Sequence, residues 1–361
     1  MRNRSIAYPQ LLCSLVVAFT VLGSSTLGSV EAQTASFDVV DLGWPGEALE
    51  AELVDIADDG NVLLNATFDG SESAFLHDGD AFSEVESGGG DFVATAIDRS
   101  GQIAGWIVER GDGTEDPSPM AALIVGDSVV EMPGDTSQSL SLGVSPEGVV
   151  VGQASEESDP QALRPVTWSD TDVDFLADVD GDTTGAALDM NSIGQVVGWT
   201  GELATGTMAM RWDDGAPVRL EVDGEPFSFA VAINATGSAV GGASNDSSMR
   251  GSDTRAIQWD ASGATMLPVV EGISWAFATD INDAGIVVGV AGVEQPGEGD
   301  PETVAVTWSA GEMFDLNSMI GSETGLTLVE AVAVNSFGQI LCLGIDSSGE
   351  AHALVLSVIG N

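Results

Sequence analysis

The sequence predicts an all-β protein, a seven-bladed β-propeller in which the N-terminal strand completes the last blade. Three observations lead to this prediction. A short turn motif recurs seven times, each copy is followed by further strand-like segments, and the strand missing after the last copy stands before the first. Repeats of about 40 to 50 residues that contain several short strands are typical of propeller blades.

The turn motif begins with Asn, Asp, Ser or Ala and has glycine three residues later, between two apolar segments. An Asn or Asp side chain at the first position accepts hydrogen bonds from its own turn, and glycine takes a backbone conformation that other residues resist. The motif therefore predicts a hairpin. The turn glycines, at a mean spacing of about 46 residues, are Gly60, Gly101, Gly148, Gly194, Gly237, Gly285 and Gly338.

A second apolar segment follows each turn, and in four copies it ends in tryptophan. Recurrence at the repeat spacing marks these tryptophans as core residues: Trp168, Trp212, Trp259 and Trp308. A fourth strand follows in several copies, most plainly at Met313–Leu316, but the chain ends soon after Leu356. We expect Phe37–Leu42 to supply the strand that the last copy lacks, which would close the ring and cover an exposed edge.

The chain resembles the extracellular HAF repeat family from Phe37 to about Val358. The family pairs an Ile-Asn-x-x-Gly-x-x-x-Gly segment, seen here at Ile281–Gly289, with a later segment that ends in tryptophan. The resemblance implies export and a propeller but no particular reaction. Departures from the pattern cluster in the first and third units, where Ala57 and Ser145 replace asparagine and Leu64 replaces the second glycine.

The charge is strongly negative. Asp and Glu number 57, the nine basic residues are all arginine, and the formal net charge is −48. Such a surface repels itself in dilute buffer, whereas the Debye length falls to about 3 Å at 1 M salt. The charge therefore indicates adaptation to a salty environment, with divalent-cation binding or a basic partner as alternatives. Nucleic acid and anionic membrane surfaces are disfavoured as partners.

Residues 1–32 have the features of a secretory signal peptide. Arg2 and Arg4 precede the apolar stretch Leu11–Leu22, and small residues allow cleavage after Ala32. The apolar stretch is short for a membrane span, so an uncleaved anchor is the weaker alternative. We therefore expect a single monomeric domain over residues 33–361, located outside the cell or in the periplasm and without membrane insertion after cleavage.

Two groups of aspartates are candidate cation sites. Asp178, Asp180 and Asp182 alternate around Gly181, as in part of a calcium loop, although the full calcium-loop pattern is absent. Aligning the repeats places Asp55, Asp189 and Asp280 in one column, two residues before the turn residue. Because small residues fill the same column in the other repeats, the column is expected near the axis, where three carboxylates would attract cations. The alternatives are solvated turns for the first group, and capping of neighbouring turns or exposure to solvent for the second.

Trp106 and Trp199 also share a column, directly after the second glycine of their repeats. Exposed on one rim, their rings would stack on sugars, whereas burial between blades is the commoner fate of tryptophan. The sequence thus suggests glycans as ligands.

Little in the sequence supports catalysis. His77 and His352 are the only histidines and lie in repeat strands, Cys342 lies in an apolar run, and no serine elbow, zinc spacing, phosphate loop or haem motif is present. We therefore predict a non-catalytic binding or interaction scaffold for a glycan, a cell-envelope component or a protein. The alternatives are a carbohydrate-active enzyme with carboxylates at the channel mouth and a structural matrix or surface protein.

Overall fold

The computed structural model describes residues 36–46, 48–108, 118–133, 136–156, 158–169, 172–177, 179, 181, 184–246, 249, 253–293 and 302–359. In this part of the chain, the secondary structure consists of 28 β-strands and two short 3-10 helices, η1 (Leu316–Met319) and η2 (Ser322–Thr324). No described helix is long and apolar enough to cross a membrane.

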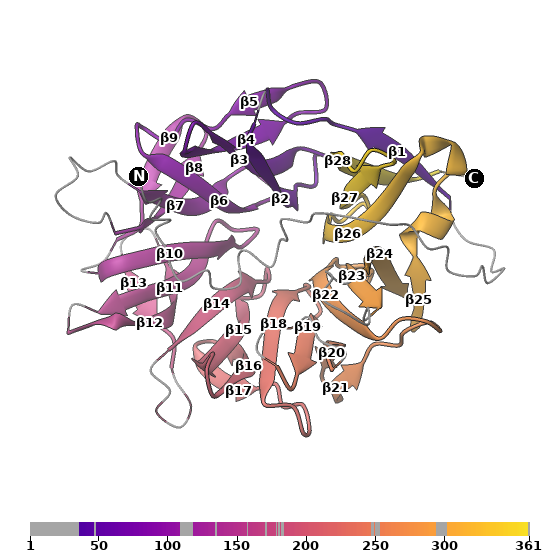
Figure 1. Ribbon diagram of the computed structural model, residues 1–361. Coiled ribbons are helices and arrows are strands. Elements are labelled where there is room, and N and C mark those ends of the chain that lie inside the picture. The colour runs from indigo at the N-terminus through magenta and orange to yellow at the C-terminus, as the bar shows by residue number, and fades with distance from the viewer. Residues whose placement is uncertain are drawn as a thin grey trace, which may run out of the picture.

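The strands form consecutive four-stranded antiparallel groups, here called blades 1 to 7, arranged around a central axis (Figure 1). Blade 1 contains β2 (Glu50–Ile56), β3 (Val62–Phe68), β4 (Ser71–His77) and β5 (Phe82–Glu84). Blade 2 contains β6 (Asp91–Ile97), β7 (Ile103–Val108), β8 (Met120–Val125) and β9 (Ser128–Glu131). Blade 3 contains β10 (Thr136–Val144), β11 (Val150–Glu156), β12 (Asp159–Trp168) and β13 (Val173–Phe175).

Blades 4 and 5 are joined into one sheet by a single parallel pairing, of Thr207 with Phe227. Blade 4 contains β14 (Gly185–Met190), β15 (Gln195–Glu202), β16 (Gly206–Asp213) and β17 (Ala216–Arg219). Blade 5 contains β18 (Phe227–Ile233), β19 (Ala239–Ser244), β20 (Arg255–Asp260) and β21 (Gly263–Met266). Blade 6 contains β22 (Trp275–Ile281), β23 (Val287–Val293), β24 (Glu302–Ser309) and β25 (Glu312–Asp315).

Blade 7 combines both ends of the described chain. Its strands are β26 (Leu326–Val334), β27 (Ile340–Asp346), β28 (Ala351–Val358) and β1 (Phe37–Asp41). Strand β1 pairs antiparallel with β28, with Phe37 opposite Val358 and Asp41 opposite Leu354. The first strand of each blade contacts its counterpart in the next, and β26 contacts β2, so the ring closes. The predicted closure by the N-terminal strand is confirmed.

The turn glycines have the predicted backbone conformation. All seven have φ between +76° and +89°, the left-handed region that glycine enters without steric cost. In each turn, the glycine N–H donates to the carbonyl of the residue that begins the motif. The repeated motif is therefore the hairpin between the first two strands of every blade.

Each first strand contains a β-bulge one residue before the aspartate column. The unpaired residues are Val54, Thr95, Leu142, Leu188, Val231, Thr279 and Val332. A bulge bends a strand and redirects its side chains. Because the bulge recurs at the same position of every first strand, the residues of the aspartate column have equivalent positions beside the axis in all seven blades.

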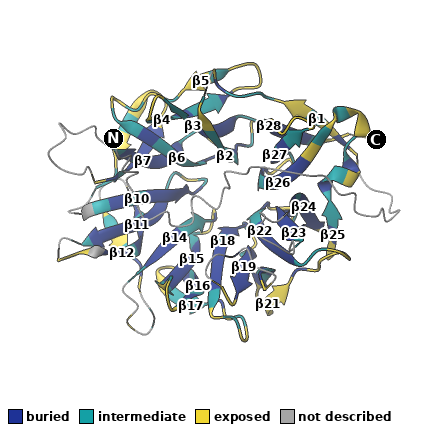
Figure 2. Cartoon of the chain, viewed as in Figure 1, coloured by how far each residue is buried: buried dark blue, intermediate teal, exposed yellow. Residues whose placement is uncertain are grey.

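Buried residues gather in the second and third strands of the blades, whereas outer strands such as β5 and β21 are mostly exposed (Figure 2). Trp168, Trp212, Trp259 and Trp308 are at most 2% exposed. The prediction that this column belongs to the core is confirmed. Their clusters combine residues of neighbouring blades, so packing between sheets holds the ring together.

Candidate functional site

A cavity of about 180 Å³ lies on the axis, at the end of the ring where the Gly-containing turns are. Every blade contributes residues to it, from the last positions of its first strand and from the turn that follows. Six of the lining residues are acidic and one is basic. They are Asp55, Asp58, Asp98, Asp189, Asp280, Asp283 and Arg99.

The three aspartates of the predicted column line this cavity and also join neighbouring blades. In each, one carboxylate oxygen accepts a hydrogen bond from the next N–H of its own strand, and the other accepts one from the first strand of the following blade. The distances lie between 2.7 and 3.1 Å. Asp55 accepts from Ile56 and Ile97, Asp189 from Met190 and Ile233, and Asp280 from Ile281 and Val334. The three carboxylates therefore line the axial cavity and also hold backbone N–H groups of two neighbouring blades.

Burial raises the pKa of all three carboxyl groups, to about 6 for Asp55 and Asp189 and to about 8 for Asp280. The nearby charge of Asp55 adds to the effect of burial on Asp280, and the backbone hydrogen bonds act in the opposite direction. At neutral pH Asp55 and Asp189 are therefore mostly ionised and Asp280 is mostly protonated, and a bound cation would favour the ionised form of all three.

The raised pKa values predict that the protein loses stability as the pH rises. The folded pKa of Asp280, about 8, lies above the value of about 3.9 for an unfolded chain, so the folded state binds more protons between the two values. The free energy of unfolding should therefore increase as the pH falls from about 9 to about 5. Urea unfolding at constant KCl measures it.

Above about pH 7, Asp280→Asn should reduce the slope of the free energy of unfolding against pH, because the Asp280 carboxyl titrates in this range in the folded protein. Burial also raises the pKa of Glu52, to about 7, outside the cavity, so Glu52→Gln is a control that should leave the step near pH 8 intact. An unchanged slope in Asp280→Asn would show that this carboxyl does not titrate in that range.

Turn asparagines form a chain of hydrogen bonds around half of the ring. In each, Oδ1 accepts from N–H groups of its own turn, and Nδ2 donates to the backbone carbonyl of the first turn residue in the next blade. The donor–carbonyl pairs are Asn191 to Asn234, Asn234 to Asn282, Asn282 to Asn335, and Asn335 to Ala57. This series of hydrogen bonds ends at blade 1, because the first turn residues of blades 1 to 3, Ala57, Asp98 and Ser145, have no side-chain amide. Asparagine is thus a link between blades as well as a turn residue.

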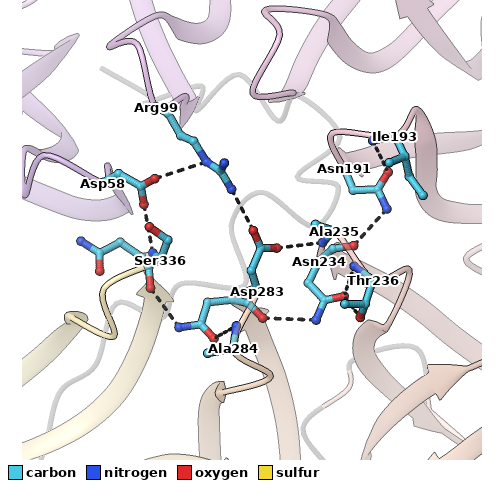
Figure 3. A network of polar contacts seen from close by, with 12 residues as sticks. Asp58, Arg99, Asn191, Ile193, Asn234, Ala235, Thr236, Asp283, Ala284 and Ser336 are labelled. Carbon is cyan, nitrogen blue, oxygen red and sulfur yellow. Dashed lines mark hydrogen bonds and ion pairs between the residues drawn. The ribbon is translucent and has the colours of Figure 1, made fainter.

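Arg99 lies across the mouth of the cavity (Figure 3). Its Nε is 3.2 Å from Oδ2 of Asp58 in blade 1, and its Nη2 is 3.0 Å from Oδ2 of Asp283 in blade 6. The other oxygen of each aspartate is fixed by a neighbouring blade: Ser336 N–H donates to Asp58 at 3.0 Å and Ala235 N–H to Asp283 at 2.8 Å. The mouth therefore presents two oriented carboxylates, and a guanidinium group already bridges them.

Our sequence analysis did not single out Arg99, Asp58 or Asp283. All three follow the first residue of a turn, and aligning that column would have shown two acids and one of the few basic residues of the chain at one rim. Which of them meet depends on the curvature of the ring, which the repeat does not encode.

The tryptophans predicted to stack on sugars lie in one apolar cluster with Phe229, Trp275 and Phe277. Trp199 is 3% exposed and packs edge-on against Phe229, and Trp106 is partly buried. Packing covers the Trp199 ring, so Trp199 lies in an interior cluster, and Trp106 packs against the same cluster and is partly accessible.

Asp178, Asp180 and Asp182 lie outside the described residues. Within the described part, no group of three or more His, Cys, Asp or Glu side chains is arranged to hold a metal ion.

His77 is buried against Phe82, and its Nδ1 accepts from the Gly79 N–H. The Nδ1 of His352 lies 2.8 Å from Oδ2 of Asp41, between β28 and β1. Cys342 is buried, and burial raises the pKa of its thiol. These groups serve the packing and closure of the blades.

Four-stranded sheets arranged around a central channel define a β-propeller. Solved structures of similar fold include a streptogramin B lyase, with a TM-score of 0.54 and 10% identity over 90% of this chain and 98% of that one. The β-propeller domain of the Trilobed protease from Pyrococcus furiosus matches with a TM-score of 0.52 and 10% identity over 86% and 98%. YCF48 bound to D1 peptide matches with a TM-score of 0.50 and 12% identity over 91% of this chain and 99% of that one.

At these identities the similarity shows the fold alone, and the neighbours include enzymes as well as other proteins. The P. furiosus domain has an open velcro topology, whereas β1 and β28 close the ring here. No family model matches the sequence, and no curated protein matches it.

Proposed function

We propose that this β-propeller is a non-catalytic binding protein that holds a positively charged group at the turn end of its channel. The observation that carries the proposal is the axial cavity, which six aspartates and a single arginine line. Because the cavity walls come from all seven blades, closure of the ring fixes the carboxylates before any ligand arrives. Preorganised acceptors of this kind lower the cost of ordering the site on binding.

The geometry favours a binding role over a catalytic one. Both oxygens of Asp55, Asp189 and Asp280 already accept backbone hydrogen bonds, so these carboxylates are held in place between blades. Among the ligand classes that the sequence suggests, an acidic site of this kind favours a protein with basic side chains or a glycan with free amino groups over a neutral glycan. Export and a salty working environment are part of the same proposal and are supported by the N-terminal segment and by the net charge of −48.

Binding of a small organic cation tests the proposal. We expect ethylguanidinium to bind in the cavity and the neutral, similarly shaped ethylurea not to bind, as measured by calorimetry at the lowest salt concentration at which the protein stays folded. Asp283→Asn should weaken binding about threefold to tenfold, because it removes one charge-assisted partner at the mouth. Asp346→Asn is the matched control, since Asp346 hydrogen-bonds within its own distant turn. Equal affinity for both probes, or equal weakening by both substitutions, would refute a cation site at the mouth.

One observation favours an enzyme as the second candidate. A carboxyl group with a pKa of about 8 beside others with a pKa of about 6 supplies the protonated acid and the ionised base that glycosidases and lyases use. Incubation with a panel of polysaccharides at high salt tests it. Depolymerisation that is lost in Asp280→Asn would establish the enzyme and replace the binding proposal.

A further inference from the structure

We propose that the ligand is a protein segment that inserts an arginine side chain, flanked by apolar residues, into the channel mouth and displaces Arg99. This inference rests on the proposed function and names the partner class of the same site. It draws on three features of the mouth: the bridge made by Arg99, the orientation of its two carboxylates, and an apolar pair on the surrounding rim.

The contacts of Arg99 show that a guanidinium group fits the mouth. Its Nε and Nη2 reach carboxylates of two different blades, Asp58 at 3.2 Å and Asp283 at 3.0 Å. A guanidinium spreads its donors over a planar fork, whereas the ammonium of lysine is a compact point charge. Two acceptors that approach different nitrogens of one group therefore select arginine over lysine.

The same contacts show that Arg99 can be replaced. Its side chain is 50% exposed, and those of Asp58 and Asp283 are 24% and 40% exposed. Ion pairs between side chains this exposed contribute little to stability, so releasing Arg99 costs little. The carboxylates stay in position without it, because the Ser336 and Ala235 N–H groups hold their other oxygens. Arg99 thus fills a binding site for a guanidinium group, and the site keeps its geometry when Arg99 leaves.

The rim beside the mouth carries two apolar side chains that the fold does not use. Ile193 is 65% and Phe337 is 76% exposed. Both occupy the position before the turn glycine, and polar or small residues stand there in the other blades: Asp59, Ser100, Glu147, Thr236 and Ala284. Phe337 directly follows Ser336, the residue that orients Asp58, and blades 5 and 6 lie between Phe337 and Ile193. The apolar pair therefore flanks the turns of blades 5 and 6, and Asp283 lies in the second of these.

This combination fits a protein segment better than a free cation. A small cation would use the carboxylates alone and would leave Ile193 and Phe337 in water. Burying apolar side chains is favourable in proportion to the area removed from water, and this contribution persists at salt concentrations that screen charges. The net charge of −48 attracts a basic partner over long range. Once the partner is bound, burial of Ile193 and Phe337 adds to the affinity.

The probe for the experiment is a tripeptide of leucine, arginine and phenylalanine with both ends blocked, and the matched probe has citrulline in place of arginine. Citrulline has the same shape as arginine and no charge. We expect the arginine tripeptide to bind at least tenfold more tightly than the citrulline one and at least threefold more tightly than ethylguanidinium, as measured by calorimetry in the same buffer.

Three variants and a control locate the binding site. Arg99→Gln should increase the affinity for the arginine tripeptide about threefold to tenfold, because the site is then vacant. Phe337→Ser and Ile193→Ser should each weaken binding of the tripeptide at least threefold without changing the affinity for ethylguanidinium. Met266→Ser is the matched control, since Met266 is 58% exposed on the outer strand β21, and it should change neither affinity.

The outcomes separate this inference from the proposed function. If ethylguanidinium binds but the tripeptide binds no better, or if Arg99→Gln and both rim variants leave tripeptide binding unchanged, the protein-segment proposal is overturned and the cation site stands. If the arginine and citrulline peptides bind equally, the apolar rim acts without the carboxylates and the proposal is also overturned. If neither cationic probe binds the wild-type protein or Arg99→Gln, the proposed function itself fails.

Discussion

Replacing Phe37 with alanine is expected to lower the free energy of unfolding by about 3 to 5 kcal/mol, the usual loss for a buried phenylalanine. Phe37 is 8% exposed and lies in the cluster of Leu328, Leu354 and Leu356. It is the main apolar anchor of β1, the strand that completes blade 7. Without that anchor, β1 leaves and β28 exposes its unpaired edge to solvent or to another chain.

Val40→Ala in the same strand is the matched control for Phe37→Ala. Val40 is 49% exposed, so its truncation should change the free energy of unfolding by less than about 0.5 kcal/mol. Urea titration followed by tryptophan fluorescence, at fixed pH and fixed KCl, compares the two variants. Losses of similar size would mean that β1 does not lock the ring.

Gly241→Ala is expected to destabilise the fold by about 3 kcal/mol or more, because the added methyl group has no space. A Cβ at Gly241 would lie 2.0 Å from the carbonyl oxygen of Phe229 on the adjacent strand. The backbone has to move to relieve that contact. In five blades a Cβ added at the second glycine of the repeat would lie within 2.2 Å of a first-strand carbonyl oxygen, at Gly105, Gly152, Gly198, Gly241 and Gly289.

Gly215→Ala is the control for Gly241→Ala. A Cβ at Gly215 would touch nothing within 4 Å, and its φ is +76°. Alanine there costs only the strain of a left-handed backbone, about 1 kcal/mol. Thermal unfolding of both variants at the same salt concentration measures the difference. Equal losses would show that close packing of the first two strands is not what the second glycine provides.

Much of the fold follows from the repeat. The turn glycines, the tryptophan column and the completing strand at Phe37 were all predicted from spacing, because each depends on contacts within one blade or between equivalent positions of neighbouring blades. The departures from the pattern are also local. Leu64 and Cys342 stand where five blades have the second glycine, and both side chains are buried in the clusters beside the closure of the ring.

The candidate site was predicted only in part. The aspartate column was placed near the axis from the small residues that share it, and Asp55, Asp189 and Asp280 do line the cavity. The backbone bonds that these carboxylates make to the next blade were not foreseen, since they depend on the bulge that precedes the column. The tryptophan pair was ambiguous because the repeat places both residues in one column without indicating whether that column is covered, and packing against Phe229 covers Trp199.

The sequence by itself determined the hairpins and the order of the strands, because hairpin hydrogen bonds and turn conformations act between residues close in the chain. It also determined the position of the closing strand, because the strand that the last repeat lacks stands before the first repeat. Only the tertiary structure decided that Arg99 meets Asp58 and Asp283, residues of three different blades. That meeting depends on the curvature of the closed ring. Curvature arises from the summed packing of all seven blades, so no single repeat encodes which side chains face one another across the channel.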